Sequence, residues 1–220
     1  MADGRFFSYA DTMDALPAYV SGLAAVLLLT SFIKIFTSLN ILRYGLGLHS
    51  GAFGIVIAGL SFALTLVVMT PYLGANAGIE QLVGKGAEDP ATQSKLRPFI
   101  EKHAHKQVTE RLNQISLKLA AAPDTAGSAD QSNSASQRAV SYSVLIASFV
   151  ISELQEAFYV GLLLLVPFVI LDLVVANVLT ALNITQLPLA VVALPLKLFV
   201  FFAVDGWQLV SEKLLNGYLH

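Results

Sequence analysis

The sequence contains no cysteine among its 220 residues. This absence excludes disulfide bonds and thiolate chemistry. Charge is also scarce, because charged residues make up 13% of the chain, against about a quarter in soluble domains. The formal net charge of −2 gives no global sign of nucleic-acid binding. We therefore expect a surface covered by lipid or by a large assembly, and no nucleic-acid partner.

Basic residues are scarce at the start of the chain as well. Asp3, Asp11 and Asp14 stand there against Arg5. A secretory signal peptide needs a basic region before its apolar core. The sequence therefore predicts no cleaved signal peptide and a retained first apolar segment.

Long apolar runs are abundant, and hydrophobic residues make up 55% of the chain. Each of the main runs is close to the roughly 20 residues that a helix needs to cross about 30 Å of hydrocarbon. These runs are residues 15–33, 52–73, 157–182 and 187–204. Pro195 and Lys197 interrupt the last one. The pattern predicts an all-α, membrane-type protein of helical hairpins, with four long apolar helices.

A polar helical insert separates the second apolar helix from the third. The predicted parts are an N-terminal hairpin at residues 1–73, the insert at 74–143 and a C-terminal hairpin at 144–220. Within the insert, apolar residues recur with helical spacing over residues 95–119 and predict an amphipathic helix, with Pro98 in its first turn. Residues 122–138 have the small, polar composition of a flexible linker.

The distribution of basic residues between the apolar runs predicts a topology. Residues 31–51 carry Lys34 and Arg43 and no acid, so the positive-inside rule places this loop in the cytoplasm. Strict alternation then places both termini and the polar insert outside the cytoplasm.

The third apolar helix is predicted to begin near residue 153, before its apolar run. Ser152 and Gln155 have the spacing of a capping box, and Glu153 and Glu156 would lie in the first turn. Acids at that end of a helix interact favourably with its dipole. At the other end of the hairpin, Trp207 follows the last apolar run, where an interfacial aromatic anchor is expected.

Polar residues within the apolar hairpin need partners, because a charge near the bilayer centre costs at least about 2.5–3.5 kcal/mol. The residues concerned are Asp172, Asn177, Lys197 and Asp205. Counted from a turn near residues 184–187, Lys197 and Asp172 lie at similar depth and could pair within one hairpin. Lys197 and Glu153 would differ by about 25–30 Å along the helix axis, so they could pair only between staggered subunits. Structural ion pairs are the favoured reading, and an ion relay or a pore lining stays open.

The sequence does not assemble an enzyme site. No nucleophile, base and oxyanion donor come together, and the order of residues around Asp205 differs from that of an intramembrane aspartyl protease. His103 and His105 have a spacing that splits them across a helix, unlike a zinc-binding pair. We expect no catalytic, metal or cofactor site.

Four stretches together carry a recognisable pattern. They are "TSFIKIFTSLNILRYGLGL", "GLSFALTLVVMTPYL", "SELQEAFYVGLLLLVPFVILDLVVANVLTAL" and "LPLKLFVFFAVDGWQLV". With them the chain resembles the FliP/SctR family, the export-gate protein shared by bacterial flagella and type III secretion systems. The polar insert has no matching motif.

The resemblance implies a core, non-enzymatic subunit of the export gate in the bacterial inner membrane. It implies self-association, typically as a pentamer, with two smaller membrane subunits of the same system. Unfolded secreted proteins would pass through this channel, and the subunits would bury each other's apolar hairpins largely outside the membrane plane. Matching positions imply staggered contacts between Glu153 and Lys197 of neighbouring subunits, with Asp172 and Asp205 as the family's other acidic positions.

The turn of the C-terminal hairpin departs from the family pattern. Relatives often place methionines here as a flexible seal around the channel, whereas this chain has Asn183, Ile184, Thr185, Gln186 and Leu187. The stretch "GLHSGAFG" also lacks the proline-containing turn expected of the family. This second difference and the absence of a predicted signal peptide favour the injectisome branch, a virulence system. Two other functions stay open: a small secondary transporter or proton-coupled subunit, which needs Asp172 to titrate, and a membrane scaffold without a pore.

Overall fold

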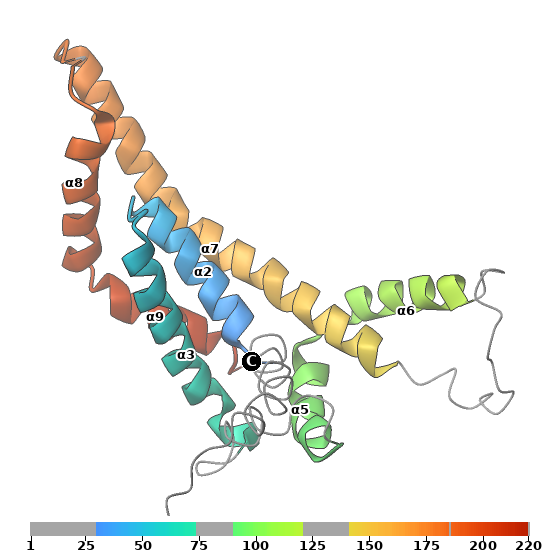
Figure 1. The fold of residues 1–220 in the computed structure, drawn as a ribbon. Coiled ribbons are helices and arrows are strands. Elements are labelled where there is room, and N and C mark those ends of the chain that lie inside the picture. The colour runs from blue at the N-terminus through green and yellow to red at the C-terminus, as the bar shows by residue number, and fades with distance from the viewer. Residues whose placement is uncertain (1–29, 74–89, 121–140, 185, 220) are drawn as a thin grey trace, which may run out of the picture. The chain divides into compact units, whose positions relative to one another are not determined.

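The computed structural model describes residues 30–73, 90–120, 141–184 and 186–219. All regular structure in these ranges is helical, which confirms the all-α prediction (Figure 1). The helices are α2 (Phe32–Gly45), α3 (Gly51–Leu73), α5 (Pro90–His103), α6 (Lys106–Ala120), α7 (Tyr142–Ala181), α8 (Leu189–Ala203) and α9 (Gly206–Asn216). The predicted linker at 122–138 lies outside the described residues.

Two of the described helical segments, Gly51–Tyr72 and Tyr142–Ala181, are long and apolar enough to cross a membrane. Helices α8 and α9 meet that test only together, and they bend by 65° at the break between them. The predicted apolar helix at 15–33 falls almost entirely outside the described residues. The described part of the chain therefore supplies two, or with the bent pair three, of the predicted apolar helices.

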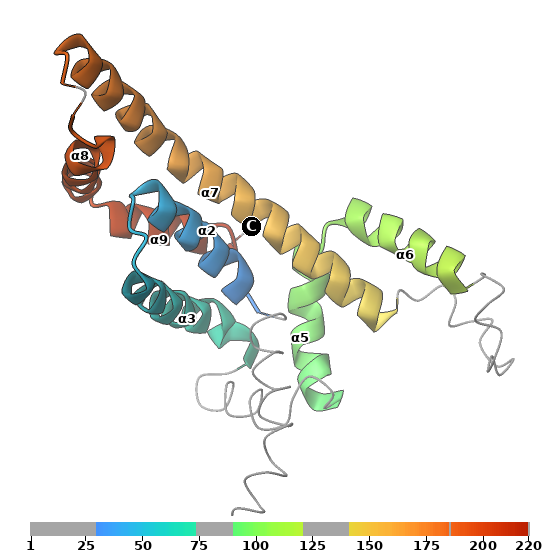
Figure 2. The same cartoon turned by 45° about the horizontal axis from the view of Figure 1, so that its top comes forward.

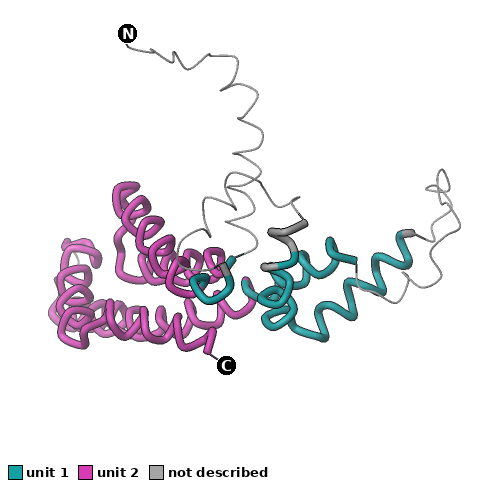
Figure 3. Tube along the Cα trace, turned by 90° about the horizontal axis from the view of Figure 1, so that it is seen from below, with its two compact units in different colours: residues 1–30, 69–153 teal, residues 31–68, 154–220 magenta. Residues whose placement is uncertain are grey.

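The chain forms two compact units, coloured separately in Figure 3. Unit 1 takes residues 1–30 and 69–153, and unit 2 takes residues 31–68 and 154–220. Each unit therefore joins stretches that are far apart in sequence. The three-part division predicted from composition stays a prediction.

In unit 1, helix α5 packs its apolar face against the start of α7. Leu96, Phe99 and Ile100 are fully buried. The Phe99 ring meets Tyr72 and Phe149 edge to face, with centroids 5.0 and 5.5 Å apart. Such pairs contribute about 0.5–1.5 kcal/mol beyond the burial of their area.

The prediction of one helix over residues 95–119 is wrong, because the helix is interrupted between the end of α5 and the start of α6. The backbone N–H of His105 donates to Ser152 Oγ at 2.9 Å, so a tertiary hydrogen bond replaces a bond of the helix ladder. Pro98 lies in the interior of α5 and not in its first turn.

Helix α7 begins at Tyr142, so the predicted start near residue 153 is wrong. Ser152 is not an N-cap, because its hydroxyl donates to the Ser148 carbonyl at 2.7 Å inside the helix. The apolar residues before it continue the helical face, and Phe149 packs on α5. Because burial of this face stabilises the helix, α7 begins ten residues before the apparent capping box at Ser152.

In unit 2, the predicted loop at 31–51 is largely helical, which corrects its interpretation as a simple connection. Ile35, Leu39, Leu42 and Leu46 recur at helical spacing and are buried. Helix α2 runs beside α7 in both Figure 1 and Figure 2.

Small residues allow α2 and α7 to approach closely. The Ser38 hydroxyl donates to the Ala157 carbonyl at 3.1 Å. A Cβ added to Gly161 would lie 2.5 Å from Ile41 Cδ1, and one added to Gly45 would lie 2.6 Å from Leu165 Cδ1. Residue numbers rise together along this contact, so the helices are parallel. Small residues at such an interface are typical of helix packing in membranes.

The C-terminal hairpin turns at a left-handed residue. Asn183 has φ 56°, the Ile184 N–H donates to the Leu179 carbonyl at 2.9 Å, and the Asn183 N–H donates to the Thr180 carbonyl at 3.0 Å. This is a Schellman motif, in which Asn is the usual substitute for glycine. Helix α8 then turns back from the end of α7 (Figures 1 and 2).

Candidate functional site

A buried lysine joins three helices of unit 2. Lys197 on α8 donates to Asp172 Oδ2 on α7 at 2.6 Å and to the Gly45 carbonyl at the end of α2 at 2.9 Å. Sequence counting placed Lys197 and Asp172 at similar depth, and the structure forms this contact. We call these three residues the Lys197 cluster.

The surroundings of the Lys197 cluster make each partner necessary. The Lys197 side chain is 8% exposed and that of Asp172 is 34% exposed. A buried ammonium needs a counter-charge and hydrogen-bond acceptors. Asp172 supplies the charge, and the Gly45 carbonyl is one of those that a helix end leaves without an intrahelical donor. A cation at a helix C-terminus also interacts favourably with the dipole.

A second buried lysine was missed by sequence reasoning. Lys34 on α2 is 1% exposed and forms an ion pair with Glu156 on α7. Its Nζ also lies 4.3 Å from the centroid of the Tyr218 ring. The periodic apolar residues from Ile35 onward were the signal that could have shown it, because they place the 31–51 segment on a helix packed against protein. We call Lys34, Glu156 and Tyr218 the Lys34 cluster.

The two clusters tie both ends of α2 to α7. Lys34 lies in the first turn of α2 and binds Glu156, while Gly45 ends α2 and receives Lys197, which Asp172 holds on α7. Along α7 the two acids are separated by 16 residues, or about 24 Å at 1.5 Å per residue. The arrangement fixes the register of α2 on α7, and it contains no feature of a catalytic centre.

Glu153 and Asp205 are placed differently from the other predicted charges. Glu153 is 1% exposed and is the last residue of unit 1 in sequence. Asp205 is exposed and forms no ion pair with any residue that the structure describes. Its φ of 49° places it in the left-handed region at the break between α8 and α9, and its carbonyl accepts from the Gln208 and Leu209 N–H groups at 2.9 and 3.1 Å. Asp205 therefore has a local role in the bend.

The predicted gate turn forms the tip of the hairpin. Asn183 sets its left-handed geometry, and Ile184 and Leu187 are exposed by 38% and 48%. Gln186 is also exposed, while Thr185 lies outside the described residues. The tip thus presents apolar side chains on a backbone whose direction is set by a defined helix cap.

Large apolar side chains cover the exposed surface of α7 and α8. On α7 they recur along more than half of the helix, and on α8 Phe199 and Phe202 are 71% and 63% exposed. The α7 set is Phe158, Tyr159, Leu162, Leu163, Val166, Val169, Ile170, Leu173, Val174 and Val178. Contiguous apolar surface of this kind marks contact with lipid or protein.

The sequence of the chain matches the FliP family over residues 19–214. It belongs to this family. The chain is 35% identical to flagellar biosynthetic protein FliP of Pectobacterium carotovorum subsp. carotovorum, over 89% of this chain and 73% of that protein. It is 32% identical to the FliP of Caulobacter vibrioides, over 88% and 70%. A protein of Xanthomonas campestris pv. glycines named pathogenicity-related ORF2 is 30% identical, over 88% and 89%.

Membership of the FliP family and the apolar helices α3 and α7 make the chain a membrane protein of the bacterial inner membrane. The predicted family is therefore confirmed. Both flagellar relatives and a pathogenicity-related one match, so the injectisome branch stays a prediction.

Proposed function

We propose that the chain is a channel-forming core subunit of a type III export gate, which oligomerises to pass unfolded proteins across the inner membrane. FliP family membership supports a place in a flagellar or type III export apparatus. The observation that carries the channel role is the C-terminal hairpin. Its charged residues Asp172 and Lys197 pair inside the protomer, while its outer face is mainly apolar and holds the exposed Asn177.

The uncovered face supports self-association. A single protomer leaves long apolar side chains of α7 and α8 exposed on the hairpin, and further copies would cover them. The proposed partners of the chain are further copies of itself, which form a pentamer, and two smaller membrane subunits of the same system. The transporter alternative has weaker support, because Asp172 is held as the partner of Lys197.

Crosslinking at the hairpin tip tests the channel. Because the chain has no cysteine, Ile184→Cys would be the only thiol in it. In assembled gates with a stalled substrate that carries one cysteine, we expect a disulfide crosslink at position 184. Lys213→Cys, on the exposed surface of α9, is the matched control and should not crosslink. Assembled gates with no crosslink at 184 would favour a scaffold without a pore.

The periplasmic location of the polar insert is a second part of the proposal. Helix α6 offers exposed positions for a test, because Leu117 is 48% exposed. We expect Leu117→Cys to react with a membrane-impermeant maleimide added to spheroplasts. Labelling that requires lysis would place the insert in the cytoplasm and reverse the topology.

The injectisome branch is supported by the stretch "GLHSGAFG" at residues 47–54, which lacks the proline-containing turn expected of the family. Expression in strains that lack the corresponding flagellar or injectisome subunit separates the branches. Recovery of effector secretion without motility is the expected result, and recovery of motility would assign the chain to the flagellar branch.

A further inference from the structure

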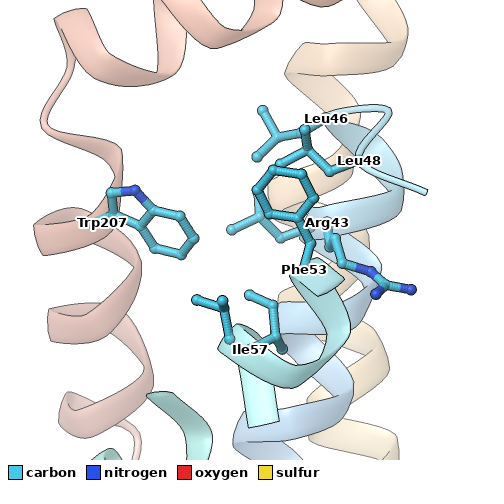
Figure 4. A pocket seen from close by; sticks show the side chains of 8 residues that line it. Arg43, Leu46, Leu48, Phe53, Ile57 and Trp207 are labelled. Atoms are coloured by element: carbon cyan, nitrogen blue, oxygen red, sulfur yellow. The ribbon is translucent and has the colours of Figure 1, made fainter. Parts of the chain in front are cut away.

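An apolar crevice of about 110 Å³ lies within unit 2, between α2, the start of α3 and α9. Figure 4 shows the Trp207 ring on one side, facing Leu46, Phe53 and Ile57 on the other. The lining residues are Leu42, Arg43, Leu46, Leu48, Phe53, Val56, Ile57 and Trp207. We call this space the Trp207 crevice. The crevice is smaller than the apolar cavity of about 150 Å³ that binds benzene, so it has room for only a few methylene groups of a hydrocarbon chain.

Arg43 is the charged residue among those that line the Trp207 crevice. It is 8% exposed, and its Nε is buried without a hydrogen-bond partner. Its contact is a cation–π interaction with Tyr44, in which Cζ lies 4.7 Å from the ring centroid. Among the residues that the structure describes, the Arg43 guanidinium forms no hydrogen bond or ion pair. A buried cation without an anion costs several kcal/mol.

The guanidinium lies beside another positive group, the N-terminus of α3. A Cβ added to Gly54 would lie 2.8 Å from Arg43 Nη1, and Gly54 belongs to the first turn of α3. Backbone N–H groups and the helix dipole make that end of a helix attractive to anions. Gly51 has open space around its Cα. Two positive groups therefore converge at a place that a small anion can approach.

Figure 4 separates the charged and apolar ends of this site. The Arg43 guanidinium points away from Trp207, with Phe53 between them. A ligand that uses both ends must therefore carry an anionic group beside an apolar chain. A peptide segment fits poorly, because its backbone amides would meet apolar walls without hydrogen-bond partners.

We propose that the Trp207 crevice binds an anionic phospholipid, with its phosphate on Arg43 and the start of α3 and part of an acyl chain against Trp207. A guanidinium matches the geometry of a phosphate. Arg43 lies near the end of α2, on the acid-free segment 31–51 for which the sequence predicts the cytoplasmic side. Anionic lipids attract basic groups there. The proposal holds for one protomer and does not depend on the channel.

Trp207 reports on this crevice directly, because it is the only tryptophan in the chain. The full chain is reconstituted in nanodiscs of phosphatidylcholine that contain a low mole fraction of acyl-brominated lipid, which quenches tryptophan on contact. Brominated phosphatidylglycerol should quench Trp207 at about fivefold lower mole fraction than brominated phosphatidylcholine, as one basic residue contributes about 1 kcal/mol to binding anionic lipid.

Three variants separate the contribution of the lipid head group from that of the acyl chain. Arg43→Gln should abolish the preference for phosphatidylglycerol. Lys213→Gln removes the same charge from the exposed surface of α9 and should keep the preference. Leu48→Phe narrows the crevice and should reduce quenching by both lipids, which tests the proposal even if Arg43→Gln does not fold. Equal quenching by the two lipids in the natural chain, or a preference that survives Arg43→Gln, would overturn it.

Discussion

At the scale of residues, the buried cations of unit 2 are satisfied to different degrees. Lys197 has a carboxylate and a helix-terminal carbonyl, and Lys34 has a carboxylate and an aromatic ring. Arg43 has an aromatic ring. Because an unpaired buried charge is expensive, the loss of a partner should be more costly than the loss of the cation itself.

The Lys34 cluster allows that asymmetry to be measured. Glu156→Ala leaves the 1% exposed Lys34 without its carboxylate, and about 3 kcal/mol of stability should be lost. Lys34→Met keeps the length of the side chain and leaves Glu156, whose side chain is 39% exposed, free to hydrate, so the loss should be smaller. Thermal unfolding of the detergent-solubilised protein measures both. A larger loss for Lys34→Met would contradict the argument.

At the scale of elements, the bends of the C-terminal region depend on a few backbone positions. Asn183 ends α7 and Asp205 precedes α9, both with positive φ. Gly206 follows Asp205, and a Cβ there would overlap the Phe201 ring. The 65° bend thus needs a residue that tolerates the left-handed region, followed by one without a side chain.

Gly206→Ala should therefore destabilise the protein, whereas the same substitution at a matched glycine, Gly59, should not. Overpacking of this kind costs about 1–3 kcal/mol. A Cβ added to Gly59, inside α3, meets no atom within 4 Å, so Gly59→Ala should instead stabilise by about 0.5–1 kcal/mol through its helix propensity. The midpoint of thermal unfolding should fall for Gly206→Ala and rise for Gly59→Ala. A neutral Gly206→Ala would show that Phe201 moves aside without cost.

At the scale of the whole molecule, charge is buried while apolar surface is exposed. In unit 2 two buried lysines form ion pairs, and the outer faces of α7 and α8 are mainly apolar. This is the reverse of a soluble domain, and it fits a subunit whose surroundings are lipid and other subunits.

The Lys197 cluster gives a test at this scale. Lys197→Asp and Asp172→Lys should each block assembly and secretion, because each places like charges together. The double swap should restore assembly in part, since the Gly45 carbonyl loses its donor. Blue-native electrophoresis and secretion assays measure these outcomes. Rescue by Lys197→Glu with Glu153→Lys, and not by the swap, would show that the staggered contact between subunits dominates.

Local patterns in the sequence predicted the parts of the fold that depend on local physics. Apolar runs of spanning length predicted the long helices. Counting residues from the hairpin turn predicted that Lys197 and Asp172 lie at a similar depth along the hairpin. The Lys34 cluster escaped because Lys34 and Glu156 are 122 residues apart and α2 was taken for a loop. The helix break at His105 was not predicted because it depends on a tertiary hydrogen bond to Ser152.

The span of 122 residues between Lys34 and Glu156 also bears on the order of biogenesis. When α2 leaves the ribosome, the acid that neutralises Lys34 and the lysine that binds the end of α2 have not been synthesised. Helix α2 must therefore wait, with Lys34 hydrated at the membrane surface, until α7 and α8 arrive. A nascent chain released before residue 142 would be a substrate for quality-control proteases.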